Sequence, residues 1–202
     1  MYLKIIVVRH GQSVSNVCDV FHEDSGDELT MIGKMQAIEA GKKIRELFDK
    51  KEVLGLDAIY CSPYERAKST CASALEAARL DVKKMCNVYY DDRLRERELT
   101  GLHGKKFDKE HWIKLQDFKS DLAEKEGIET FDALEERAGN FIDDLVRKYY
   151  PIGTVLVFTH GLFELAMYTN VYGRPASGNT YELDLLKNGG MRIYNLNTYP
   201  KM

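Results

Sequence analysis

The sequence predicts an α/β fold in three layers, with a mostly parallel central sheet, helices on both of its faces and a small helical cap insertion. Two segments, residues 3–8 and 154–158, are continuously apolar and rich in β-branched side chains, which is typical of strands buried on both faces. Segments with helical spacing of apolar residues lie between them. Because strands that alternate with helices form parallel sheets with right-handed crossovers, we expect both segments to be central parallel strands.

Three helices follow from the apolar spacing and from residues that can cap them. The first and third begin after Thr30 and Thr130, whose hydroxyl groups can accept hydrogen bonds from the first turn. The second has a possible capping box between Ser62 and Glu65, with Pro63 at the first helical position. The apolar faces of these helices fall within residues 37–47, 67–78 and 131–145.

Shorter segments complete the predicted sheet. Residues 57–60 and 87–90 have strand character and complete β-α-β units. Residues 181–185 and 191–194 are separated by the turn sequence KNGG, so we expect them to form a hairpin that closes one edge of the sheet.

Length and composition indicate one domain. The chain has 202 residues, of which 44% are hydrophobic and 30% are charged, and no repeat or linker divides it. We therefore expect a single domain over residues 1–202, in which a polar segment, about residues 101–130, forms the cap insertion.

Charge and hydropathy argue against several kinds of partner. The formal net charge is −3 and both signs are mixed along the chain, so neither nucleic acid nor anionic lipid is expected to bind. The N-terminal apolar run is too short for a signal peptide, and no run approaches the roughly 20 residues that span a bilayer. We expect a cytoplasmic protein with no membrane segment. The four cysteines lack metal-ligand spacing, which predicts reduced, mostly buried thiols. Nothing in the sequence indicates an oligomeric state.

Residues suited to catalysis follow several of the predicted strands. In open α/β sheets the ligand site lies beyond the carboxyl ends of the strands, where this chain carries residues 9–13, 61–66, 93–98 and 159–161. Taken alone, each has a structural explanation, such as a hydrogen-bonded turn histidine, a solvated helix arginine or a salt-bridged surface segment. Because two His-Gly pairs and two arginines all fall at strand ends of one sheet, we favour a single functional site.

Five motifs, in order along the chain, resemble those of the histidine phosphatase superfamily, which includes the cofactor-dependent phosphoglycerate mutases. Residues 9–16 (RHGQSVSN) resemble the signature R-H-G-x-S-x-x-N. Residues 29–37 (LTMIGKMQA) resemble L-T-x-x-G-x-x-Q-A, and residues 62–70 (SPYERAKST) resemble S-P-x-x-R-A-x-x-T. LRER at 94–97 is similar to the segment that bears the acidic residue, and THG at 159–161 to the second histidine motif. The resemblance covers nearly the whole chain.

The resemblance implies a site for phosphoryl transfer. His10 would be the nucleophile, since a neutral imidazole is available near neutral pH without activation by a metal. Arg9 and Arg66 would each bind phosphate oxygens through a planar fork of donors, and His160 would stabilise charge in the transition state. The implied phosphate-binding residues are Arg9, Ser13, Asn16, Arg66, His160 and Gly161.

The general acid is implied to be Glu96, because the family's acidic residue falls at this position of the LRER motif. Glu98 is the alternative. In an extended segment, side chains two residues apart point the same way, so spacing alone does not separate the two carboxyl groups.

We therefore expect a metal-independent phosphatase that hydrolyses a small phosphorylated metabolite through a phosphohistidine on His10, with no metal ligands and no cofactor. A mutase that moves the phosphoryl group between hydroxyls and a non-catalytic phosphate-binding module are the alternatives. Residues 105–126 lack the adjacent arginine pair with which glycolytic mutases hold the substrate carboxylate, which favours the phosphatase. Specificity would come from this segment and from the loop at residues 21–27, with Trp112 on the apolar side of the cap.

Overall fold

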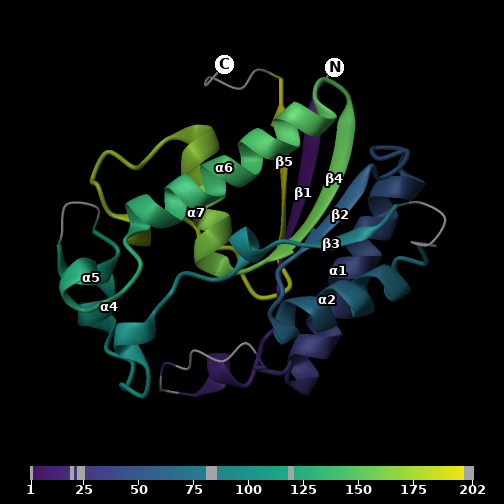
Figure 1. Cartoon of the computed structure of the whole chain (residues 1–202). Coiled ribbons are helices and arrows are strands. Elements are labelled where there is room, and N and C mark those ends of the chain that lie inside the picture. Colours follow the sequence, from purple (N-terminus) through teal and green to yellow (C-terminus); the bar gives the residue numbers. More distant parts are fainter. Residues whose placement is uncertain (1, 19–20, 22–25, 81–85, 118–120, 198–202) are drawn as a thin grey trace.

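A five-stranded sheet between two layers of helices forms the centre of the molecule (Figure 1). The strand order is β3-β2-β4-β1-β5, with β5 antiparallel to β1 and all other neighbours parallel. This confirms the predicted three-layer α/β fold. The computed structural model describes residues 2–18, 21, 26–80, 86–117 and 121–197. The strands are β1 Leu3–Arg9, β2 Ala58–Cys61, β3 Val88–Tyr90, β4 Gly153–Thr159 and β5 Met191–Leu196.

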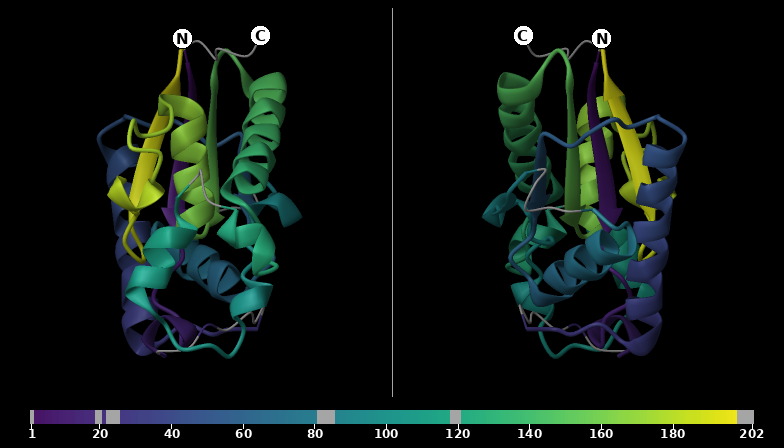
Figure 2. Two further views of the ribbon diagram at one scale, coloured as in Figure 1. Left: turned by 90° about the vertical axis from the view of Figure 1, so that its left-hand side faces the viewer. Right: turned by 90° about the vertical axis from the view of Figure 1, so that its right-hand side faces the viewer.

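Helices cover both faces of the sheet, as the views from its two sides show (Figure 2). α1 and α2 pack on one face and α6 and α7 on the other, while the short α4 and α5 lie in the segment predicted to form the cap. None of the described helices is long and apolar enough to cross a bilayer. The helices are α1 Met31–Asp49, α2 Glu65–Ala77, α4 Lys109–Leu115, α5 Leu122–Lys125, α6 Phe131–Tyr149 and α7 Gly161–Tyr172.

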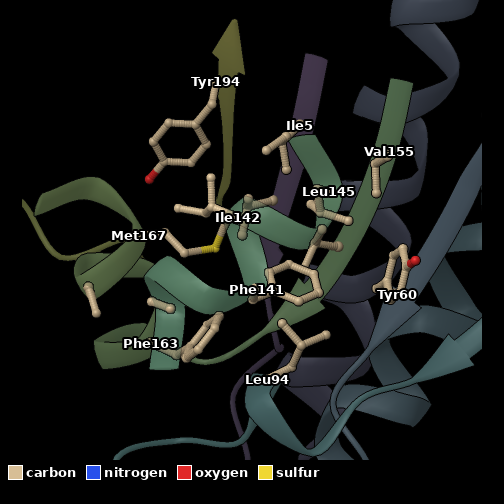
Figure 3. Close-up of a cluster of buried hydrophobic side chains, with 14 of the residues drawn as sticks. Ile5, Tyr60, Leu94, Phe141, Ile142, Leu145, Val155, Phe163, Met167 and Tyr194 are labelled. Atoms are coloured by element: carbon tan, nitrogen blue, oxygen red, sulfur yellow. The ribbon is translucent and has the colours of Figure 1, made fainter. Parts of the chain in front are cut away.

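Two apolar cores lie against the two faces of the sheet. Side chains alternate along β1, so Ile5 packs toward α6 and α7, whereas Ile6 packs toward α1 and α2. In the core on the α6 and α7 side, the ring centre of Phe141 lies 5.4 Å from that of Tyr60 in β2 and 6.3 Å from that of Phe163 in α7 (Figure 3). Because both faces of β1 and β4 are buried, these strands have continuous apolar sequences instead of a polar face.

The strand order places a crevice at the carboxyl ends of β1 and β4. These strands are neighbours, with Arg9 opposite Thr159, yet the helices that follow them, α1 and α7, lie on opposite faces. The chain therefore leaves the two strands in opposite directions, which is the arrangement that opens ligand sites in doubly wound sheets. His10 and His160 are the first residues after the two strands.

The predicted starts of α1 and α6 are confirmed, and that of α2 is wrong. The hydroxyl oxygens of Thr30 and Thr130 accept backbone hydrogen bonds of 3.1 and 3.2 Å from the first turns. α2 begins at Glu65, two residues later than expected, without a side-chain cap. The expected capping hydroxyl, that of Ser62, lies instead 2.8 Å from Nε2 of His160.

The predicted C-terminal hairpin is wrong in its first strand. Residues 181–185 form no strand, and Thr180–Glu182 is a short 3-10 helix capped by the side chain of Asn179. The amide of Thr180 also donates to the carbonyl oxygen of Gln116 at 3.1 Å, which ties this segment to the cap. Because local side-chain and loop contacts satisfy this backbone, β5 pairs with β1 instead and closes the edge by itself.

A small third core belongs to the segment between β3 and α6. It consists of Leu102, Leu115, Ala123 and Ile128, which lie within the residues predicted to form the cap, with Phe21, Leu99, Trp112 and Leu122 packed against them. In Figure 1, α4 and α5 stand apart from the strands, beyond the end of the sheet that carries the crevice. The cap core is a distinct cluster, and Trp112 packs against both it and the core on the α6 and α7 side of the sheet.

The cysteines differ in burial. Cys61 and Cys71 are buried and Cys86 is half-buried, but Cys18 is exposed, against the expectation of mostly buried thiols. The reason is that Cys18 follows a single 3-10 turn, Ser15–Val17, that buries none of its residues.

A close backbone contact holds the loop after β1 against the first turns of α1. A Cβ added to Gly11 would lie 2.3 Å from the carbonyl oxygen of Gly33, and one added to Gly33 would lie 2.0 Å from that of Gln12. Gln12 also accepts from the amide of Thr30 at 2.9 Å and donates its own amide to Oε1 of Gln36 at 2.8 Å. The position of this loop therefore depends on α1.

We expect Gly33→Ala to lower the free energy of unfolding by about 1–3 kcal/mol or more, because the added methyl group overlaps a backbone carbonyl. Gly55→Ala is the matched control, since a Cβ at Gly55 meets no atom within 4 Å. The control should change stability by less than about 0.5 kcal/mol in urea denaturation. Equal stability of the two variants would contradict the close contact.

Candidate active site

His10 is held as a neutral ring whose Nε2 atom is unprotonated. It is 2% exposed, and its Nδ1 lies 2.7 Å from the carbonyl oxygen of Gly11, which can only accept, so Nδ1 carries the proton. Burial, together with the charges of Arg66 and Arg9, holds the pKa of His10 well below its usual 6.5. At neutral pH the lone pair on Nε2 is therefore available as a nucleophile.

Two guanidinium groups lie beside this imidazole, each fixed by other parts of the chain. Arg9, the last residue of β1, donates from Nη1 to the carbonyl oxygen of Leu186 at 2.6 Å, and burial lowers its pKa. Arg66, in the first turn of α2, places Nη1 3.6 Å from Oδ2 of Asp27 and its Cζ 5.0 Å from the ring centre of Tyr64. Side chains held in this way are positioned before a ligand arrives.

His160 follows β4 and packs against His10, with 5.0 Å between the ring centres. It is fully buried, and burial with the nearby positive charges of Arg66 and Arg9 holds its pKa well below the usual value. The hydroxyl group of Ser62 lies 2.8 Å from Nε2 and so fixes the orientation of the ring. Both histidines of the site are thus neutral near pH 7.

Two buried nitrogen atoms in this site, Nε of Arg9 and Nδ1 of His160, have no hydrogen-bond partner among the described residues. Buried polar atoms are nearly always paired in native proteins, so such atoms require an explanation. Both belong to residues that adjoin His10. A phosphate group at the nucleophile is an acceptor that suits both donors.

Glu96 lies at the N-terminus of α7, where the positive end of the helix favours a carboxylate. Its Oε1 accepts from the amides of Leu162 and Phe163 at 3.1 and 3.2 Å, and also from its neighbour Arg97 at 3.0 Å. Its Oε2 makes one longer contact, 3.3 Å from the amide of Leu162. Oε2 is therefore the less engaged of the two oxygens.

Glu98, the alternative general acid, lies elsewhere. Its side chain is about half exposed, with Oε1 3.6 Å from Nη2 of Arg95. The expectation that Glu96 and Glu98 point the same way is wrong because the segment is not an extended strand. Its backbone pairs with Glu129, whose amide donates to the carbonyl oxygen of Glu98 at 2.9 Å. The geometry favours Glu96 over Glu98.

These groups face one cavity of about 390 Å³. The structure thus brings six of the predicted site residues to one cavity, while His160 packs against His10 and is not itself part of the lining. The polar lining consists of Arg9, His10, Ser15, Asn16, Arg66, Glu96 and Gly161. The remaining lining residues are Cys18, Phe21, Leu99, Phe107, Trp112, Leu162 and Leu185.

Ser13 is fully buried next to the site. Its amide donates to Oδ1 of Asn16 at 3.2 Å, and its hydroxyl oxygen lies 3.1 Å from that of Ser15. Ser13 therefore stabilises the loop after β1. A direct contact between Ser13 and phosphate stays a prediction. Gly161 has a steric role, because a Cβ there would lie 3.0 Å from Cζ of Arg9.

Asp27 supports the site and was not predicted. It is 8% exposed, and its carboxylate accepts from the amide and hydroxyl of Ser15 at 3.0 and 2.5 Å while it faces Arg66. In the sequence it is one of several acidic residues in a polar loop, and no local pattern separates it from its neighbours.

Arg137 is a second supporting residue that the sequence did not reveal. From α6 it donates to the carbonyl oxygens of Arg93 and Arg95 at 2.6 and 2.8 Å, and it pairs with Glu129 at 2.7 Å. These bonds hold the segment that leads into Glu96. Along α6 it occupies an ordinary polar position, so the helical pattern gives no signal of this role.

Phe21, Phe107 and Trp112, which lie in the two segments expected to set specificity, line the cavity. Lys105 does not, and its Nζ lies 3.8 Å from Oε2 of Glu126. Residues 22–25 of the predicted specificity loop lie outside the described residues. Within the described part of the chain no group of three or more His, Cys, Asp or Glu side chains is arranged to hold a metal ion. The absence of a metal requirement stays a prediction.

Comparison with known proteins identifies the family. Residues 5–197 match the model of the histidine phosphatase superfamily, branch 1. The chain belongs to this superfamily, as its five motifs predicted.

Among its relatives are both phosphatases and a mutase. The chain is 28% identical over 170 residues to a putative phosphoserine phosphatase 2 of Hydrogenobacter thermophilus, covering 78% of this chain and 73% of the relative. It is 26% identical over 184 residues to a probable phosphoglycerate mutase of Erwinia tasmaniensis, covering 87% and 77%. A mycobacterial glucosyl-3-phosphoglycerate phosphatase, solved with VO3, has a TM-score of 0.73 at 20% identity, covering 94% and 90% of the two chains. The similarity to this solved structure, at 20% identity, concerns the fold alone.

The low pKa values of the two buried histidines make stability depend on pH. In the unfolded chain both rings titrate near the usual 6.5, so below that pH only the unfolded state takes up the protons, and stability falls as the pH falls. Each ring contributes at most about 1.4 kcal/mol per pH unit. We expect the free energy of unfolding of His10→Asn, measured in urea, to fall less steeply than that of the wild type between about pH 7 and pH 5. Equal slopes would show that His10 is not buried in its neutral form.

Proposed function

We propose that this protein is a metal-independent phosphomonoesterase that acts on a small phosphorylated metabolite of the cytoplasm. The observation that carries the proposal is the unprotonated Nε2 of His10 beside Arg9 and Arg66 in one cavity. Membership of the histidine phosphatase superfamily and the phosphatase names among the relatives support the same reaction class.

In the first step Nε2 of His10 attacks phosphorus, and the N–P bond forms as the ester P–O bond breaks. Arg9 and Arg66 neutralise the equatorial oxygens, and Nδ1–H of His160, which has no partner among the described residues, donates to one of them. Glu96 protonates the leaving oxygen from Oε2, the oxygen that is less engaged with α7.

In the second step water cleaves the phosphohistidine. Glu96, now a carboxylate, takes a proton from the attacking water, and phosphate leaves as the N–P bond breaks. His10 returns to its neutral form with the proton still on Nδ1, because the carbonyl oxygen of Gly11 continues to accept from that atom.

We expect His10→Ala to hydrolyse p-nitrophenyl phosphate at least about a thousandfold more slowly than the wild type in the presence of a chelator, because the variant lacks the nucleophile. The wild type, quenched during turnover of a labelled phosphate ester, should carry an acid-labile label on His10. Equal activity of the two proteins would remove His10 from the mechanism. A wild type that binds phosphate without turnover would instead indicate a binding module.

The role of Glu96 is tested by comparing Glu96→Gln with Glu98→Gln, since these carboxyl groups are two residues apart and only the first lines the cavity. For an alkyl phosphate ester, Glu96→Gln should lower kcat/KM, which reports only the first step, by about 10²–10⁴-fold. The loss in kcat/KM should be smaller for p-nitrophenyl phosphate, whose leaving group departs without a proton. Glu98→Gln should stay within about twofold of the wild type, and the reverse order would assign the acid to Glu98.

A mutase is distinguished by its products. Isomerisation of 3-phosphoglycerate that requires a 2,3-bisphosphoglycerate primer and outpaces phosphate release would identify that activity. The hydrolase instead releases inorganic phosphate in a molar ratio of about one to the substrate consumed.

A further inference from the structure

The cavity has a second wall that the proposed chemistry does not use. Phe21, Phe107 and Trp112 line it together with Leu99, Leu162 and Leu185. The three aromatic rings form one cluster, with 5.5 Å between the ring centres of Phe21 and Trp112, 5.7 Å between Phe21 and Phe107, and 6.2 Å between Phe107 and Trp112. We call these three residues the aromatic wall.

The aromatic wall is a built surface backed by other residues. Phe21 and Trp112 pack on the cap core, and the backbone of Phe21 is bonded twice to the cap, with its amide 3.0 Å from the carbonyl oxygen of Lys105 and its carbonyl oxygen 3.0 Å from the amide of Gly104. Phe107 remains 50% exposed. An apolar ring that faces solvent at the mouth of a catalytic cavity gains contact area when a second apolar ring covers it.

The charges of the described lining suit only one anionic group on the ligand. Its cations are Arg9 and Arg66, and its one carboxylate is Glu96. Of the cap cations, Arg97 donates to the carbonyl oxygens of Glu129 and Leu115, Lys105 faces Glu126, and neither Lys106 nor Lys109 lines the cavity. A substrate carboxylate placed against the aromatic wall would lose water without gaining a partner among these residues, which is unfavourable.

We infer that the leaving group of the substrate is an aromatic alcohol, whose ring lies against Phe21, Phe107 and Trp112 while the phosphate lies at His10. This inference rests on the proposed phosphatase activity and narrows its substrate class. The ring stacks on or meets the edge of the wall at 4.5–7 Å in the manner of the three protein rings. Phosphate esters of small hydroxy acids, which carry a carboxylate instead of a ring, are poor substrates.

The test compares two esters that release a primary alcohol, so that the chemical step is similar. 2-Phenylethyl phosphate carries a ring and O-phosphoserine carries an amino acid. We expect kcat/KM of the wild type to favour 2-phenylethyl phosphate by at least about tenfold, the scale of one lost aromatic contact together with its buried area.

Phe107→Ala is the informative variant, because this half-exposed ring can be removed with little effect on folding. It should lower kcat/KM for 2-phenylethyl phosphate by about tenfold and leave that for O-phosphoserine within about twofold. Trp112→Leu should act in the same direction. Tyr181→Ala is the matched control, since Tyr181 is also aromatic and 47% exposed but does not line the cavity.

Two outcomes separate this inference from the proposed function. If O-phosphoserine is hydrolysed as well as 2-phenylethyl phosphate, or if Phe107→Ala affects both esters equally, the aromatic substrate class is wrong and the phosphatase stands. If neither ester is hydrolysed, calorimetry of 3-phenylpropylphosphonate against methylphosphonate decides. Tighter binding of the aromatic compound that is lost in Phe107→Ala supports the aromatic wall although the phosphatase fails, and equal binding overturns both.

Discussion

The positive charge of Arg9 and Arg66 beside two buried imidazoles is the constraint on which the site depends. Burial removes the water that would stabilise a protonated ring, and the guanidinium groups oppose a further cation, so both effects hold the pKa values of His10 and His160 low. The same field attracts a phosphate dianion. In the proposed mechanism, one arrangement thus keeps His10 unprotonated and binds the group that it attacks. Once the anion is bound, its charge compensates the arginines.

The scaffold around this charge cluster is built from segments that are distant in the sequence. Gln12 is bonded to Thr30 and Gln36, the amide of Gly11 donates to the hydroxyl of Thr70 at 3.0 Å, and the backbone of Gly33 touches the same loop. Residues 29–37 and 62–70, which resemble separate family motifs, therefore act in part as supports for the loop that bears the nucleophile.

The sequence predicted the layers and the main site residues, because both follow from strong local signals. Buried strands and amphipathic helices have characteristic periods, and residues at strand ends converge wherever a parallel sheet forms. The failures occur where one polar group had two possible partners. Ser62 could cap α2 or bond to His160, and the amide of Tyr181 could pair in the predicted strand or donate to the side chain of Asn179. A long-range contact decided the partner of Ser62, and a local side-chain contact decided the conformation at residues 180–182. The periodicity of apolar residues gives no information about such competition between hydrogen-bond partners.

Asp27 and Arg137 could not be found from the sequence for a related reason. Each acts through distant residues, Asp27 on Arg66 and Arg137 on the backbone before Glu96, so neither lies in a recognisable pattern. The choice between Glu96 and Glu98 likewise depended on how the chain turns against Glu129.

The two walls of the cavity are stabilised by different parts of the molecule. Arg9, His10 and Arg66 are carried by the sheet and by helices whose cores hold most of the buried apolar residues, whereas Phe21 and Trp112 of the aromatic wall pack on the four-residue cap core. Trp112 packs against both the cap core and the core that α6 and α7 share with the sheet, but Phe21 and Phe107 do not pack against the latter, so these two side chains can change without disturbing the packing of the sheet. On the proposed function, a fold of this kind would keep one phosphoryl-transfer chemistry while substitutions in the cap vary the alcohol that is released.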